Sequence, residues 1–283
     1  MKPRLSPEER RERRRRAMQR SKFALPSGIT LLSILCGFSS VVMSLNAAAD
    51  HPEFHFRWAA AFLVLAGFFD GMDGRVARLT NTATEFGVQL DSLADVVSFG
   101  MAPAILAYRY GFFQLGILDP HLRAVGWGAS FFFIACGALR LARFNVQVGH
   151  VDGRFFVGMP IPAGAACIAS VILCWPSSPQ SSLHAYLFAA ELFLVGLLMV
   201  STVRFPSFKK GTKSPRARYW TLVAVTLVFS LFLIFQWRFF VGFFAAYILL
   251  GLALNVGWKL GWRGMQPPHD GVALDEAAED TVH

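Results

Sequence analysis

Four aspartates stand at helical spacing on two adjoining apolar segments. Asp70 and Asp73 are three residues apart, Asp91 and Asp95 are four apart, and Glu85 is the only other acid between residues 56 and 118. At about 100° per residue, each pair shares one face of a helix. Carboxylates gathered at a membrane boundary repel one another unless they bind cations or protons. Since oxygen ligands suit Mg²⁺ or Mn²⁺ better than zinc, the pattern predicts a divalent-metal site.

Small residues and an arginine accompany these acids. Gly74 and Gly87 are poor helix formers, and the absence of a side chain lets a ligand approach the backbone. Arg78, one turn beyond Gly74, can hold a phosphate with its planar guanidinium group. Metal ligands, glycines and arginine together indicate a diphosphate site. The alternatives are structural ion pairs between these acids and Arg75 or Arg78, or a path for protons or ions.

The elements that must position these residues are transmembrane helices. The chain has 283 residues, of which 54% are hydrophobic and only 16% charged, a composition too apolar for an ordinary soluble domain. A helix needs roughly 20 apolar residues to cross a bilayer, and by that length the chain contains about eight spans. We predict spans at residues 26–46, 56–79, 84–110, 122–145, 159–176, 182–203, 219–236 and 239–257.

The basic residues fix the predicted orientation. With eight spans and a cytoplasmic N-terminus, 23 of the 27 Lys and Arg fall on cytoplasmic segments, which is the positive-inside asymmetry. Both termini and the aspartates are then cytoplasmic, in a multi-pass protein that we expect in a cell inner membrane. The net charge of +9 is explained by membrane topology and anionic lipids, so we predict no nucleic-acid partner. Glu191, inside the sixth span, is a further functional hypothesis.

The residues from Asp70 to Asp95 resemble a known family signature. The pattern D-x-x-D-G-x-x-A-R-x8-G-x3-D-x3-D of the CDP-alcohol phosphotransferases is matched at every fixed position. Segments 92–104, 139–145, 156–162 and 199–209 resemble the phosphatidylserine synthase branch of that family. One departure is Ser27, because relatives commonly have Asn after the proline that precedes it.

The resemblance implies a fold and a domain plan. The family is all-α and integral to the membrane, with a six-helix core and usually a homodimer, so about two C-terminal transmembrane helices would be additional. The predicted regions are a basic cytoplasmic arm at 1–22, the transmembrane core at 23–210, the additional helices at 211–258 and a disordered cytoplasmic tail at 259–283.

The resemblance also implies roles for the residues above. Asp70, Asp73, Asp91 and Asp95 would hold two Mg²⁺ or Mn²⁺ ions, with Asp95 also taking the hydroxyl proton, while Gly74, Arg78 and Gly87 would line the site for the CDP moiety. The substrates would be CDP-diacylglycerol and L-serine, in phospholipid biosynthesis.

The acceptor pocket is predicted from charge. The carboxylate of serine needs a cation, and Arg140 and Arg143 stand at the cytoplasmic end of the fourth span, with Asn145 as a partner for the ammonium or hydroxyl group. The alternative is that both arginines only set the topology. Glycerol 3-phosphate or an inositol phosphate remains open as the acceptor, and a divalent-cation transporter is the rival from another class of protein.

Overall fold

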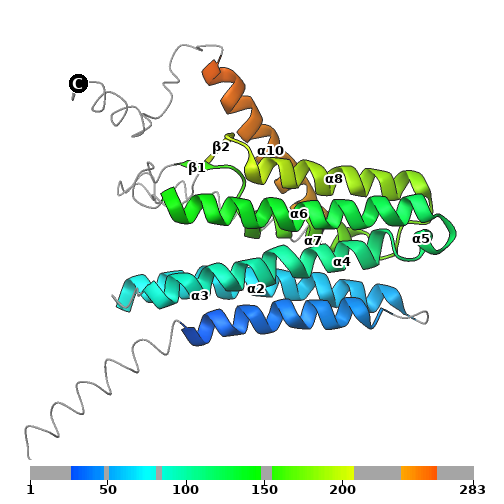
Figure 1. The fold of residues 1–283 in the computed structure, drawn as a ribbon, viewed down its shortest axis with the longest axis horizontal. Coiled ribbons are helices and arrows are strands. Elements are labelled where there is room, and N and C mark those ends of the chain that lie inside the picture. The colour runs from blue at the N-terminus through cyan, green and yellow to red at the C-terminus, as the bar shows by residue number, and fades with distance from the viewer. Residues whose placement is uncertain (1–26, 48–50, 81–84, 148–154, 207–236, 260–283) are drawn as a thin grey trace, which may run out of the picture.

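The structure is a bundle of long helices that run back and forth between two ends (Figure 1). It is a computed structural model that describes residues 27–47, 51–80, 85–147, 155–206 and 237–259. The basic arm, the predicted span at 219–236 and nearly all of the predicted tail lie outside the described residues.

The first described helix, Ser27–Leu45, runs from the end that carries the aspartates to the opposite end. Its seam toward the bundle is made of small side chains spaced three or four residues apart, which lets neighbouring helices approach closely. The buried members of this seam are Thr30, Ser33, Gly37, Ser40 and Ser44. Ser33 Oγ donates to the carbonyl of Ala66 at 3.2 Å, so the seam also bonds the helix to its neighbour.

Two elements bring the aspartates to one end of the bundle. α2 (Pro52–Thr80) descends to that end, and α3 (Glu85–Asp95) returns from it. α3 continues through a π-helix, η1 (Val96–Met101), into α4 (Ala102–Gly111). Pro103 lacks an N–H group and its ring clashes with the preceding turn, so the wider π turn accommodates it. The third predicted span is therefore one long helix with an irregular turn directly after Asp95.

The remaining helices complete the bundle. α5 (Leu115–Leu118) is a short turn at the opposite end, and α6 (Pro120–Gln147) runs back and packs along α8 (Ser182–Val200). α7 (Ile161–Cys174) packs against α2 and against α10 (Trp237–Lys259), which crosses the bundle at a tilt in Figure 1. α10 accounts for one of the two predicted additional helices, and the other lies outside the described residues.

A two-stranded ribbon joins the segment before α7 to the segment after α8, and both segments lie between predicted spans. β1 (Phe155–Val157) pairs antiparallel with β2 (Arg204–Pro206). Gly158 follows at φ 77°, and a Cβ there would lie 2.3 Å from the carbonyl oxygen of Met199. The left-handed turn and Pro160 delay the helix, so α7 begins at Ile161 and its 14 residues are fewer than the predicted 159–176.

The protein is an all-α, multi-pass membrane protein. Among the described residues, five helices are long and apolar enough to cross a bilayer: Ser27–Leu45, Phe86–Gly111, Pro120–Val146, Ser182–Val200 and Trp237–Gly257. α7 is apolar but shorter. α2 falls outside this group despite its 29 residues, and its last turns carry Asp70, Asp73, Arg75 and Arg78. The predicted span at 56–79 therefore ends in charged residues, and the predicted span at 219–236 lies outside the described residues.

Candidate active site

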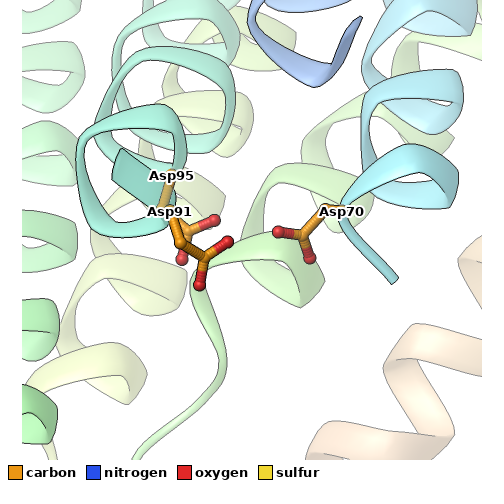
Figure 2. Close-up of side chains that lie close together, drawn as sticks. All are labelled: Asp70, Asp91 and Asp95. Atoms are coloured by element: carbon orange, nitrogen blue, oxygen red, sulfur yellow. The ribbon is translucent and has the colours of Figure 1, made fainter. Parts of the chain in front are cut away.

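Three of the four predicted aspartates converge where α2 and α3 meet (Figure 2). Asp70 comes from α2, while Asp91 and Asp95 lie one turn apart on α3. One carboxylate oxygen from each side chain lies within 4.8 Å of those from the other two. Asp91 is exposed and the other two are partly buried, so the group borders the surface of the bundle. The sequence prediction that the two helices bring their acids together is confirmed for these three residues.

Asp73 is placed differently. It is buried, and its Oδ2 accepts a hydrogen bond of 2.8 Å from Thr30 Oγ1 on the first helix. Its charge still interacts with that of Asp91, so Asp73 lies next to the cluster, on the side of the first helix. The four predicted metal ligands thus divide into a group of three and one carboxylate that is anchored to a neighbouring helix.

Two polar atoms near the cluster are buried without a hydrogen-bond partner among the described residues. They are Asp95 Oδ1 and Nε of Arg140, a side chain on α6 that is only 7% exposed. The charges of Arg140 and Asp95 interact. Unsatisfied buried polar atoms are costly and rare, so their presence here indicates room for a further polar group or ion. The residues fit a divalent ion because they offer several oxygen ligands and one unused buried oxygen.

The space beside the cluster is open on the α2 side. A Cβ added to Gly74 would meet no atom of the described residues within 4 Å, and Gly74 itself is exposed. Gly87 on α3 is partly buried. The backbone at Arg78 belongs to α2, but its side chain lies outside the described residues, so its predicted phosphate contact stays a prediction.

The residues predicted for the acceptor lie at the same end of α6, with different surroundings. Arg143 donates to the backbone carbonyls of Val200, Val157 and Ser201 at 2.9, 3.1 and 3.1 Å. It therefore joins α6 to the ribbon and to the end of α8. Asn145 Nδ2 donates to Ser92 Oγ at 3.0 Å, which links α6 to α3 next to Asp91.

Sequence reasoning missed the support that the first helix gives to the site. Besides Thr30, the backbone carbonyl of Ser33 accepts a hydrogen bond of 3.1 Å from Ser98 in η1. A Cβ on Gly37 would lie 2.8 Å from the Cα of Ser98, so the two helices are in close contact there. The signal was present in the sequence, as the run of small and hydroxyl side chains at helical spacing from Thr30 to Ser44.

The arrangement provides three chemical capabilities at one place. The carboxylates can bind cations or accept a proton, the space beside Gly74 can admit a ligand close to the backbone, and Arg140 can balance a negative charge. A phosphoryl-transfer site needs these groups, since catalysis of such reactions rests on positioning and charge stabilisation.

Comparison with known proteins agrees with this geometry. The curated relatives that match the chain include a CDP-diacylglycerol–serine O-phosphatidyltransferase of Helicobacter pylori, which is 35% identical over 213 residues, 73% of this chain and 82% of the relative. The enzyme of the same name from Methanocaldococcus jannaschii is 34% identical over 181 residues, 64% of this chain and 72% of the relative. An archaetidylserine synthase of Methanothermobacter thermautotrophicus is 35% identical over 191 residues, which are 66% of this chain and 71% of the relative. The model of the CDP-alcohol phosphatidyltransferases matches residues 23–197, more than half of the chain, and with every signature residue in place this protein belongs to that family.

Proposed function

We propose that this protein is a phosphatidylserine synthase, which transfers the phosphatidyl group of CDP-diacylglycerol to the hydroxyl of L-serine and releases CMP. The observation that carries the proposal is the convergence of Asp70, Asp91 and Asp95 in a chain whose curated relatives from bacteria and archaea bear that activity in their names.

The nucleophile is the serine hydroxyl, which attacks the lipid-side phosphorus of the diphosphate. The new bond joins serine Oγ to that phosphorus, and the bond from the phosphorus to the oxygen of CMP breaks. Asp95 accepts the hydroxyl proton, because its Oδ1 is buried near the other carboxylates and has no partner among the described residues. CMP leaves with the electron pair of the broken bond.

The carboxylates are proposed as the ligands of two Mg²⁺ or Mn²⁺ ions. Asp70, Asp91 and Asp95 supply the clustered oxygens, and Asp73 contributes from behind while Thr30 fixes its orientation. When bound, such ions neutralise the diphosphate and stabilise the departing phosphate. The open space beside Gly74 admits the CDP moiety, with Gly87 and Arg78 as its further contacts.

For the acceptor we propose Arg140 as the partner of the serine carboxylate, because it retains a buried donor near Asp95. Arg143 and Asn145 then shape the pocket through their bonds to the ribbon and to α3. We further propose that the active site and both termini face the cytoplasm, that the additional helices occupy 211–258, and that the protein acts as a homodimer in a cell inner membrane.

The test is the choice of acceptor. Purified protein is incubated with CDP-diacylglycerol, Mg²⁺ or Mn²⁺ and one alcohol at a time, and CMP release is measured. We expect release with serine that is abolished by EDTA and restored by the metal. Release with glycerol 3-phosphate or an inositol phosphate but not with serine would overturn the assignment of serine as the acceptor. Release without metal would overturn the role of the aspartates as metal ligands.

A further inference from the structure

A second hollow opens at the end of the bundle opposite the aspartates. It is a cavity of about 780 Å³ between the end of α4, α7, the start of α8 and the connection that joins the last two. One face of α8 lines it, because His184, Leu187, Phe188 and Glu191 recur at the spacing of three and four residues that keeps side chains on the same side of a helix.

The lining of the cavity combines polar and apolar residues. Its polar lining comes mainly from the connection between α7 and α8, with Ser177, Ser178 and Gln180. Its walls include the apolar side chains of Val171, Leu187 and Phe188. Glu191 lies nine residues into α8, about 14 Å from the start of the helix at 1.5 Å per residue.

Glu191 is the one acid among the described residues that line the cavity, and His184 is the one basic side chain. His184 Nδ1 is 2.8 Å from Ser181 Oγ, and the Tyr110 hydroxyl donates to the carbonyl of Trp175. The described residues that line the cavity include no lysine and no arginine. An ionised carboxylate at this depth in an apolar helix is costly unless a positive charge compensates it or a proton neutralises it, and apolar and aromatic walls favour an organic cation over a hydrated metal ion.

We propose that this cavity binds a small water-soluble organic amine, whose ammonium group pairs with Glu191 and whose apolar part lies against Phe188, Leu187 and Val171. This site is separate from the transfer reaction, because it opens at the other end of the bundle and shares no residue with the aspartate cluster.

The test uses phenethylammonium as the probe and phenethyl alcohol as its neutral counterpart, titrated into the purified full-length protein by calorimetry. We expect saturable binding of the amine and binding of the alcohol that is weaker by about tenfold or more, since a charged hydrogen bond is lost. The Glu191→Gln substitution should weaken binding of the amine by a similar factor. Glu53→Gln removes the same charge at the same end from an exposed carboxylate that accepts a hydrogen bond from Ser177 but does not itself line the cavity, and this variant should bind the amine normally.

Gel filtration and thermal unfolding establish that Glu191→Gln is folded. If that variant misfolds, Val171→Phe serves as the second test. This substitution narrows the cavity without changing its charge and should also weaken binding of the amine. No binding of the amine, equal binding of amine and alcohol, or undiminished amine binding by a folded Glu191→Gln variant would each overturn the proposal.

Discussion

Acidic and polar side chains have different contacts at the two ends of the bundle. At the carboxylate end, three aspartates lie within 4.8 Å of one another and leave Asp95 Oδ1 and Arg140 Nε without partners among the described residues. At the opposite end, Arg109 donates to the backbone carbonyls of Ser44, Leu45 and Ala47, and aromatic rings pack edge to face. Like charges that remain together mark the end where the transfer reaction is proposed, whereas the hydrogen bonds of Arg109 and these ring contacts at the opposite end join helices to one another.

The largest effect should come from removing one charge of the cluster. Asp91→Asn keeps the size of the side chain but weakens the hold on cations, so we expect CMP release to fall by about a thousandfold. Glu53→Gln at the opposite end is the matched control, since Glu53 is exposed and its Oε1 accepts a hydrogen bond from Ser177 Oγ, far from the aspartates. We expect its rate to be unchanged within about twofold. Equal losses in both variants would abolish the contrast between the ends.

The two arginines of α6 sharpen the comparison within the carboxylate end. Arg140→Gln should raise the KM for serine by about 10- to 100-fold with a nearly unchanged KM for CDP-diacylglycerol, because a charged hydrogen bond to the acceptor is lost. Arg143→Gln should instead lower the thermal unfolding temperature, since three backbone carbonyls lose their donor. Steady-state kinetics and thermal unfolding of both variants decide the matter, and the reverse pattern would assign the serine carboxylate to Arg143.

How far the sequence predicted the site depended on whether a residue's neighbours were also local in sequence. The pairing of Asp70 with Asp91 and Asp95 followed from helical spacing and from two helices that are joined by a short connection. The anchoring of Asp73 by Thr30 joins residues 43 positions apart, and only the packing of the first helix reveals it. Likewise, the charges of Arg140 and Arg143 were evident, but which one is saturated by carbonyls depends on the ribbon that the sequence did not predict.

The lengths of apolar segments predicted the long helices, but they did not predict the irregular turns that prolines and glycines produce. The helices of α6 and α8 match their predicted spans to within a few residues at most ends. The π turn at Val96–Met101 and the late start of α7 at Ile161 arise from Pro103, Gly158 and Pro160, whose local geometry a hydropathy pattern does not contain.

Two glycines, one at each end of the bundle, have different surroundings. Gly74 borders open space among the described residues, whereas Gly126 packs against the ring of Phe112. Gly74→Ala adds a methyl group to open space, so we expect thermal stability to be kept or slightly raised while the KM for CDP-diacylglycerol rises about tenfold. Gly126→Ala on α6 would place its Cβ 2.2 Å from the ring of Phe112, and should lower the unfolding temperature. The folded fraction of Gly126→Ala should keep the normal KM. A destabilised Gly74→Ala with unchanged KM would mean that the space beside it is not a ligand site.

The smallest expected effect tests whether the hydrogen bonds behind the cluster matter for catalysis. Thr30→Val removes the hydroxyl that donates to Asp73 Oδ2 and preserves the shape of the side chain. One hydrogen bond to a carboxylate is worth about 1.5 kcal/mol, so the rate should fall about tenfold at limiting metal and recover in part at high Mg²⁺ or Mn²⁺. Thr30→Ser, which keeps the donor, should retain most of the activity. Because the Thr30 hydroxyl donates to Asp73, a metal-dependent loss in Thr30→Val but not in Thr30→Ser would show that Asp73 acts together with the other three carboxylates. A full rate in Thr30→Val at limiting metal would leave Asp73 as a buried acid that the reaction does not use.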